Sequence, residues 1–332
     1  MKAFGYSATW LTGFIPDLPT PFDEAGAVDL EAFARLCERQ IAAGVPAIVV
    51  CETAGEASTL TPAEQESIIR AAVRLARGRV RVIAGAGSNS TSQAIALTRR
   101  AEAAGADAVL SVVPYYNKPM QAGIHAHFRA IADAVALPIV LHDIPSRTMR
   151  ELADDTLALL AQLDQFIGLR DGTGAAARPM RLRSLLPPEF RLLTGDDATA
   201  LAFVAAGGDG CISMMSNVAP DLCRTIFLTC QHGRLQSALN LQGRLARLTA
   251  ALGKESPAAV KYALCLLGHM SPATRLPLVE LDDLAKAEVA SAIAAICDED
   301  IGCPVENRSA ARLGKDSAAW PRRQPGSPVE TA

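Results

Sequence analysis

Short apolar runs alternate with amphipathic segments along most of this chain. Eight runs are rich in Val, Ile and Leu, and they do not alternate strictly between apolar and polar residues. This pattern is typical of parallel strands that are covered on both faces. The predicted strands span residues 14–18, 47–51, 80–84, 108–113, 138–142, 166–170, 191–194 and 210–214.

The segments between these runs repeat apolar residues at intervals of three and four, which predicts helices. One start signal is clear, because Thr61 precedes Pro62 and Glu64 follows closely. Eight strands, each followed by a helix, close most economically into a (β/α)8 TIM barrel. The predicted helices span residues 29–43, 62–77, 91–104, 123–136, 153–163, 179–186, 197–206 and 220–231.

An open, doubly wound sheet is the structural alternative. It would call for a glycine-rich phosphate loop after the first strand, and Pro19-Thr20-Pro21-Phe22 does not resemble one. The favoured organisation is a barrel over residues 1–230 and a C-terminal helical layer over 231–297. That layer would hold helices at 234–252, 257–267 and 281–296. The polar segment 298–332 reads as a disordered tail.

Composition narrows the classes of partner. A net charge of -3 on 332 residues gives no general attraction to nucleic acid or anionic lipid. No apolar stretch approaches the roughly 20 residues that span a bilayer. Eight cysteines without a C-x-x-C pair predict a reduced, cytosolic protein with buried thiols. No cluster of histidines and carboxylates suggests a metal, and no cofactor is expected.

Polar residues gather where the predicted strands end, which is where barrel enzymes place their chemistry. Residues 52–56 follow the second strand and 115–119 follow the fourth, while His142, Arg147 and Arg170 mark the fifth and sixth. Singly these features are ordinary, since a tyrosine pair commonly packs and a strand-end arginine commonly forms a surface ion pair. Jointly, hydroxyls, an imidazole and two guanidiniums facing one mouth suggest a small anionic ligand.

Several segments resemble a known family. They are PTPF at 19–22, AGE at 54–56, PYYNKP at 114–119, PSRT at 145–148 and TGDDA at 194–198. Residues 13–296 resemble the 4-hydroxy-tetrahydrodipicolinate (dihydrodipicolinate) synthases, within the N-acetylneuraminate lyase superfamily. The resemblance implies a TIM barrel, a homo-oligomer built as a dimer of dimers, and pyruvate as substrate. It also implies an imine between pyruvate and a strand-six lysine, whose enamine attacks an aldehyde.

The resemblance assigns roles to particular residues. Thr53 matches a threonine of the proton relay, and Tyr116 matches a tyrosine lent by the neighbouring subunit. Arg147 matches the arginine that binds the carboxylate of the second substrate. Residues expected beside the bound pyruvate are Ala54, which replaces the second of a threonine pair, Gly195 and Ile212.

Besides Ala54, further positions depart from the family pattern. His142 stands where the relay tyrosine belongs, and Arg170 stands where the imine lysine belongs; Asp17 lies in a strand that is usually apolar there. An arginine keeps its charge and cannot attack a carbonyl as a lysine can. Neither Lys118, in a loop, nor Lys261, in the C-terminal layer, is expected to replace the lysine.

We therefore expect a lyase/aldolase-family protein that binds pyruvate or a related 2-oxo acid, with imine-based synthase activity absent or very weak. In an enzyme without an imine, Arg170 would bind the carboxylate or polarise the carbonyl, and His142 would shuttle a proton. His142 could equally be an ordinary strand-end imidazole. The alternatives are a feeble synthase, or a non-catalytic binder of 2-oxo or dicarboxylic acids that acts as a sensor or as an inactive partner of a true synthase.

Overall fold

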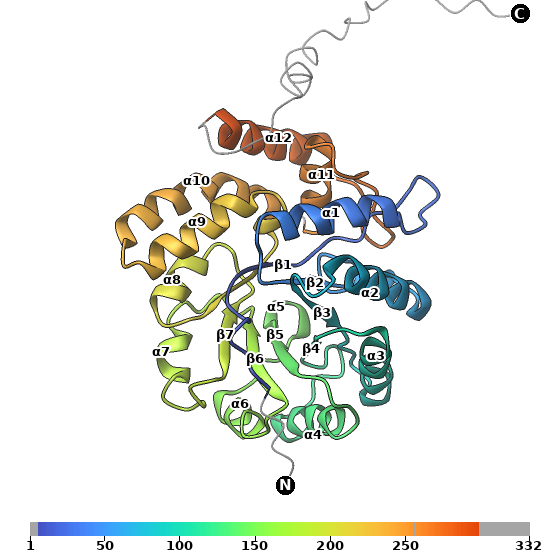
Figure 1. The fold of residues 1–332 in the computed structure, drawn as a ribbon, viewed down its shortest axis with the longest axis vertical. Coiled ribbons are helices and arrows are strands. Elements are labelled where there is room, and N and C mark those ends of the chain that lie inside the picture. Colours follow the sequence, from blue (N-terminus) through green and yellow to red (C-terminus); the bar gives the residue numbers. More distant parts are fainter. Residues whose placement is uncertain (1–5, 255, 299–332) are drawn as a thin grey trace, which may run out of the picture.

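The computed structural model describes residues 6–254 and 256–298, and it contains a (β/α)8 barrel (Figure 1). The predicted fold class is confirmed. Apart from its first residue, the predicted tail lies outside the described residues. The strands are β1 (Gly13–Pro16), β2 (Ala47–Val50), β3 (Arg81–Gly85), β4 (Ala108–Val112), β5 (Ile139–Asp143), β6 (Phe166–Asp171), β7 (Arg191–Thr194) and β8 (Gly210–Ser213).

The strands form one parallel sheet in the order β1-β8-β7-β6-β5-β4-β3-β2. The two ends of this series meet at an isolated parallel bridge between Asp17 and Val49. There the main-chain N–H of Leu18 donates to the carbonyl of Val49 at 2.9 Å. The sheet therefore curls into a barrel, and the doubly wound alternative is wrong. Asp17 lies at the seam.

Helices surround the strands as the apolar periodicity predicts (Figure 1). The capping box that begins at Thr61 is present. In it, the Glu64 side chain accepts a hydrogen bond from the main-chain N–H of Thr61. Three short elements escape the sequence pattern: α5 (Pro145–Thr148) and the 3-10 turns η1 (Ala57–Thr59) and η2 (Met215–Asn217). The other barrel helices are α1 (Leu30–Ala42), α2 (Pro62–Ala76), α3 (Thr91–Ala104), α4 (Gln121–Ala132), α6 (Asp154–Leu160), α7 (Arg178–Leu182), α8 (Ala200–Ala205) and α9 (Pro220–Gln231).

Three further helices form a layer at one side of the barrel: α10 (Leu235–Lys254), α11 (Ala258–Leu266) and α12 (Asp283–Asp298). This layer contacts the loop after β2. Lys261 of α11 pairs with Glu56, and Arg275 donates to the carbonyl of Thr59 at 3.1 Å. Arg275 also pairs with Glu64. The predicted division of the chain at residue 231 stays a prediction.

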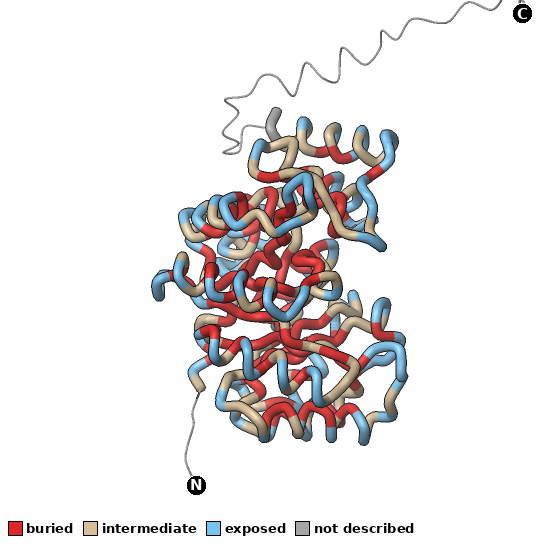
Figure 2. The backbone as a smooth tube through the Cα atoms, turned by 90° about the vertical axis from the view of Figure 1, so that its right-hand side faces the viewer, coloured by how far each residue is buried: buried red, intermediate tan, exposed pale blue. Residues whose placement is uncertain are grey.

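Burial is concentrated in the strands and on the inward faces of the helices (Figure 2). Both β5 and β6 are buried at every position. The barrel interior is filled with apolar side chains that include Ile15, Val49 and Ile212. Polar side chains interrupt this core at the carboxyl ends of the strands, so the chemistry is placed directly above the packed interior.

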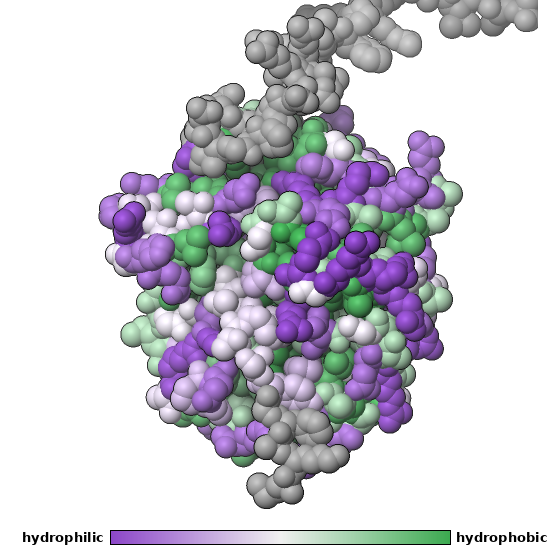
Figure 3. Space-filling view, viewed as in Figure 1, coloured by the Kyte–Doolittle hydropathy of each residue, from purple (hydrophilic) through white to green (hydrophobic). Residues whose placement is uncertain are grey.

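The face shown in Figure 3 mixes hydrophilic and hydrophobic residues, and strongly hydrophilic ones gather over α1 and α2. These helices are amphipathic, with buried residues such as Phe33 and Ile68 on their inner sides. Across the described part of the chain, no helix combines the length and apolar character needed to cross a bilayer.

Candidate active site

Four ionisable side chains meet at the carboxyl ends of the strands. His142 of β5 and Arg170 of β6 are direct neighbours in the sheet register. Asp17 follows β1 at the barrel seam, and Glu52 follows β2. Asp17, His142 and Arg170 are 0%, 1% and 2% exposed, so their charges lie out of water. Such groups need partners, because an unpaired buried charge is strongly unfavourable.

Arg170 is held between two carboxylates. Its Nη1 donates to Asp17 Oδ2 at 3.0 Å and to Glu52 Oε2 at 2.9 Å. Its Nη2 lies 3.4 Å from the carbonyl oxygen of Ile212. Burial alone would lower the pKa of Arg170, but the two carboxylates outweigh it and raise the pKa above its ordinary value. The guanidinium is therefore permanently charged, and its charge is already balanced inside the protein.

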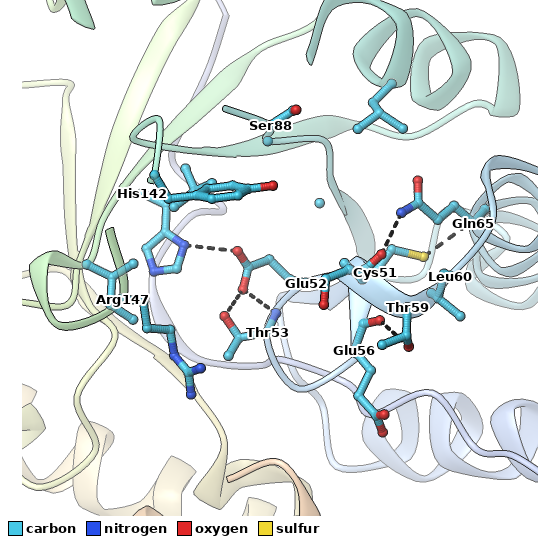
Figure 4. A pocket seen from close by; sticks show the side chains of 18 of the residues that line it. Cys51, Glu52, Thr53, Glu56, Thr59, Leu60, Gln65, Ser88, His142 and Arg147 are labelled. Atoms are coloured by element: carbon cyan, nitrogen blue, oxygen red, sulfur yellow. Dashed lines mark hydrogen bonds and ion pairs between the residues drawn. The ribbon is translucent and has the colours of Figure 1, made fainter. Parts of the chain in front are cut away.

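Glu52 links Arg170 to His142, and its contacts with His142 and Thr53 are drawn in Figure 4. Its Oε1 lies 2.9 Å from His142 Nδ1, and its Oε2 accepts hydrogen bonds from the main chain and hydroxyl of Thr53. Burial would raise the pKa of Glu52, but His142, Arg170 and Thr53 together hold that pKa below its usual range. Glu52 is therefore an ionised carboxylate that can only accept hydrogen bonds.

The partner of Glu52 fixes the tautomer of His142. Because Glu52 only accepts, the proton must sit on Nδ1 of His142, and Nε2 keeps its lone pair. Burial lowers the pKa of His142, against the opposing influence of Glu52, so the ring is neutral at pH 7. Nε2 is buried and has no hydrogen-bond partner among the described residues. A carboxylate that orients a neutral imidazole in this way is an arrangement typical of a general base.

Asp17 is the least satisfied member of the cluster. Burial raises its pKa to about 7, although Arg170 opposes the shift. Within the described chain, Asp17 Oδ1 and Arg170 Nε have no hydrogen-bond partner. Two carboxylates therefore share one guanidinium, and the second carboxylate is ionised only towards neutral pH.

A cavity of about 450 Å³ opens beside this cluster. Glu52, Thr53, His142 and Arg147 line it, whereas Arg170 does not. The expectation that both guanidiniums face the mouth is therefore wrong for Arg170. Of the described residues that line the cavity, Arg147 carries the one positive charge; it is exposed and makes no ion pair with a described residue. In Figure 4, Glu52 lies to the right of the His142 ring and the Arg147 side chain lies below it.

The residues expected beside pyruvate surround Arg170. The main-chain N–H of Ala54 lies 3.5 Å from Asp17 Oδ2, and the Ile212 carbonyl faces the guanidinium. A side-chain carbon at Gly195 would lie 3.0 Å from Arg170 Nε, so glycine leaves room for the arginine. Their contact with pyruvate stays a prediction.

Tyr116 does not join the site within one chain. Its side chain is 88% exposed, and its backbone is in the left-handed region at φ 70°, which is uncommon for a bulky residue. Tyr115, not Tyr116, lines the cavity. A role for Tyr116 across a subunit interface stays a prediction.

Sequence reasoning missed Glu52 as a functional residue and noted Asp17 only as a departure. The signal that could have found them is charge. A guanidinium and an imidazole at buried strand ends require carboxylates nearby, and these two acids stand at the ends of neighbouring strands. In the part of the chain that the structure describes, no three histidines, cysteines or carboxylates are grouped to hold a metal ion.

Comparison with known proteins gives consistent matches. A sequence model described as the dihydrodipicolinate synthetase family matches residues 10–296. The 4-hydroxy-tetrahydrodipicolinate synthase of Hyphomonas neptunium is 50% identical over 285 residues, which is 85% of this chain and 97% of the relative. The synthase of Phenylobacterium zucineum is 46% identical over 282 residues, covering 85% and 96%.

Solved structures agree in fold. Dihydrodipicolinate synthase from Aquifex aeolicus superposes with a TM-score of 0.85 at 37% identity, covering 89% of this chain and all of that one. The chloride-inhibited Acinetobacter baumannii synthase in complex with pyruvate gives a TM-score of 0.84 at 38% identity, covering 86% and 99%.

Proposed function

Because the chain belongs to the dihydrodipicolinate synthetase family, we propose that it binds pyruvate or a related 2-oxo acid at the barrel mouth and acts on it without forming an imine at position 170. A solved relative is in complex with pyruvate, which supports the class of ligand. The exposed Arg147 guanidinium offers that ligand's carboxylate a charged, bidentate partner.

The observation that carries the proposal is the state of Arg170. An imine needs a neutral amine that can attack the carbonyl carbon. Arg170 has a raised pKa, two carboxylate partners and 2% exposure. It can neither lose its proton nor reach the cavity, and it forms no covalent bond to a ketone. We therefore assign the carboxylate of the ligand to Arg147 and give Arg170 the role of holding Glu52.

Two lysines could be considered as substitutes. Lys118 is exposed and does not line the cavity. Lys261 is more plausible chemically, because burial lowers its pKa to about 8. Its Nζ, however, is paired with Glu56, donates to the Ala273 carbonyl at 2.9 Å and sits 4.0 Å from the centre of the Phe22 ring. This enclosure supports a structural role.

Further observations bear on catalysis, assembly and location. The relatives bear the name of a synthase, which does not favour a purely non-catalytic binder. The exposure of Tyr116 supports a homo-oligomer in which a neighbouring subunit receives this side chain. The buried free thiols of Cys37, Cys51 and Cys211 accord with a cytosolic location.

Borohydride trapping tests the proposal. The protein is incubated with pyruvate and borohydride, and its intact mass is measured beside a lysine-containing family member that does form the imine. We expect no added mass on this chain. A stable pyruvyl adduct would overturn the proposal, and peptide mapping would show whether Lys118 or Lys261 carries it.

Calorimetry with pyruvate tests the binding half separately. We expect binding that weakens when Arg147 is replaced by Gln and does not change when Arg150, an exposed neighbour that does not line the cavity, is replaced by Gln. Absence of heat with pyruvate and with longer 2-oxo acids would remove this half of the proposal.

A further inference from the structure

We propose that Glu52 and His142 form a carboxylate–imidazole general base that removes a proton from the carbon next to the carbonyl of a 2-oxo acid held by Arg147. This inference rests on the proposed function, because it takes its substrate class from it. It adds a catalytic residue, His142, and a positioning residue, Glu52, to a site that lacks an amine nucleophile.

The geometry provides both halves of such a base. Glu52 Oε1 accepts a hydrogen bond from Nδ1–H of His142 at 2.9 Å, so the ring cannot turn without losing this bond. Nε2 therefore keeps its lone pair on the other side of the ring, and it has no partner among the described residues. Both residues line the cavity, and so does Arg147. In Figure 4 the imidazole lies beside the orienting carboxylate, with the Arg147 side chain below the ring.

Arg170, which does not line the cavity, completes the arrangement. Through its Nη1 it holds Glu52 Oε2, while Oε1 is left for His142. Thr53 fixes the same Oε2 through its main chain and hydroxyl. An oriented, ionised Glu52 also stabilises the imidazolium that forms when Nε2 takes up a proton. The arginine thus serves the base without touching the substrate.

The proposed step is a balanced proton transfer. The lone pair of His142 Nε2 bonds to a hydrogen on C3 of the 2-oxo acid. The electron pair of the broken C–H bond forms a C2=C3 double bond, and the carbonyl π pair moves onto oxygen to give an enolate. The imidazolium exchanges its proton with water, and the reverse step returns a solvent hydrogen to C3. Solvent is the one other participant.

Deuterium exchange into pyruvate measures this step. Pyruvate is incubated with the protein in D2O, and loss of the methyl proton signal is followed by NMR against a buffer blank. We expect exchange above the blank. His142→Asn keeps a donor for Glu52 but lacks the base, so exchange should fall by about 100-fold or more. His127→Gln is the matched control: His127 is another buried histidine, bonded to Thr91 away from the cavity, and exchange should be unchanged.

Glu52→Gln tests positioning. Glu52 raises the pKa of His142, whereas burial, Arg170 and Arg147 lower it; these are the charged groups that face the ring from β2, β6 and α5. Because burial lowers the pKa of His142, the unaltered protein should keep its exchange down to pH 6.5 and lose it only at lower pH, where the base becomes protonated. In the Gln variant the remaining exchange should be slower, and its acidic limb should move to lower pH. A merely structural Glu52 would leave the limb in place.

Asp17 also titrates nearby, with a pKa of about 7, and it reaches His142 through Arg170 and Glu52. Asp17→Asn separates the two groups, because the acidic limb that belongs to His142 should persist in this variant. If His142→Asn fails to fold by circular dichroism, the pH profile decides. An acidic limb that stays above pH 6.5 in Asp17→Asn, or one that does not move when Glu52 is replaced by Gln, would overturn the general base.

The two proposals fail in different ways. A borohydride-trapped adduct would sink the proposed function, and the exchange would then belong to an imine. If no adduct forms, two results would overturn the general base: exchange at the rate of the buffer blank, or exchange in His142→Asn as fast as in the unaltered protein. Neither result would contradict the proposal that no imine forms.

Discussion

Restoring a lysine at position 170 should not be sufficient to restore an imine. In the unaltered protein, Arg170 Nη1 lies 3.0 Å from Asp17 Oδ2 and 2.9 Å from Glu52 Oε2. At an effective dielectric constant of about 20, a unit charge pair at about 3 Å is worth roughly 5 kcal/mol before desolvation, or about four pKa units. Full burial acts in the opposite direction by up to ~5 units.

The balance of these two effects decides the reactivity. With both carboxylates present, the lysine of Arg170→Lys should stay protonated at pH 8 and remain a poor nucleophile. With Asp17→Ala and Glu52→Ala added, burial acts alone and should lower the pKa of that lysine into the neutral range. Lys261 gives an internal comparison, since with burial and one carboxylate partner its pKa is about 8.

The assay is borohydride trapping with pyruvate at pH 8, read by intact mass, on the single and triple variants. We expect little adduct on Arg170→Lys and one pyruvyl group per chain on the triple variant. Circular dichroism controls for folding. Equal labelling of the two variants would refute the reasoning, because the carboxylates would then have no control over the amine.

Other predictions follow from the same contacts. Arg170→Met leaves Asp17 and Glu52 without a cation, so urea unfolding at pH 7 should show that the free energy of unfolding falls by about 3–5 kcal/mol. Most of this loss should be regained when Asp17→Asn and Glu52→Gln are added. As a control, Arg147→Met at an exposed position should change the free energy of unfolding by less than ~0.5 kcal/mol. Because the pKa of Asp17 is raised to about 7, the stability advantage of the unaltered chain over Asp17→Asn should be greatest near pH 4 and shrink as the pH rises through 7; an advantage that grows with pH would contradict this. Thr61→Ala removes the side chain of a capping box and should cost about 1 kcal/mol in the same unfolding assay, and no loss would contradict the cap.

The barrel could be predicted from the sequence because its strands are continuous apolar runs. The run at 191–194 matches β7 at both ends, and the helix at 220–231 matches α9. Periodicity could not predict α5, whose four residues are fewer than two helical turns. Boundaries also shifted at the predicted helix 123–136, because α4 begins at Gln121 and ends at Ala132.

Three residues that line the cavity could be picked out from the sequence, whereas the network that joins them could not. Thr53, His142 and Arg147 were placed at strand ends, and the structure brings them to one cavity. The inward turn of Arg170 could not be predicted, because it depends on the barrel seam that puts Asp17 beside it. Asp17 and Arg170 are 153 residues apart in the sequence, so no local sequence pattern predicts that they pair.

The contacts of α11 with the loop after β2 have a practical consequence. Glu56 lines the cavity while its carboxylate is gripped by Lys261 and by the main chain at Arg275. Described residues of the C-terminal layer therefore help to form a wall of the cavity. Shortening the protein to its eight-stranded barrel, or replacing its C-terminal part, would therefore also change the ligand cavity.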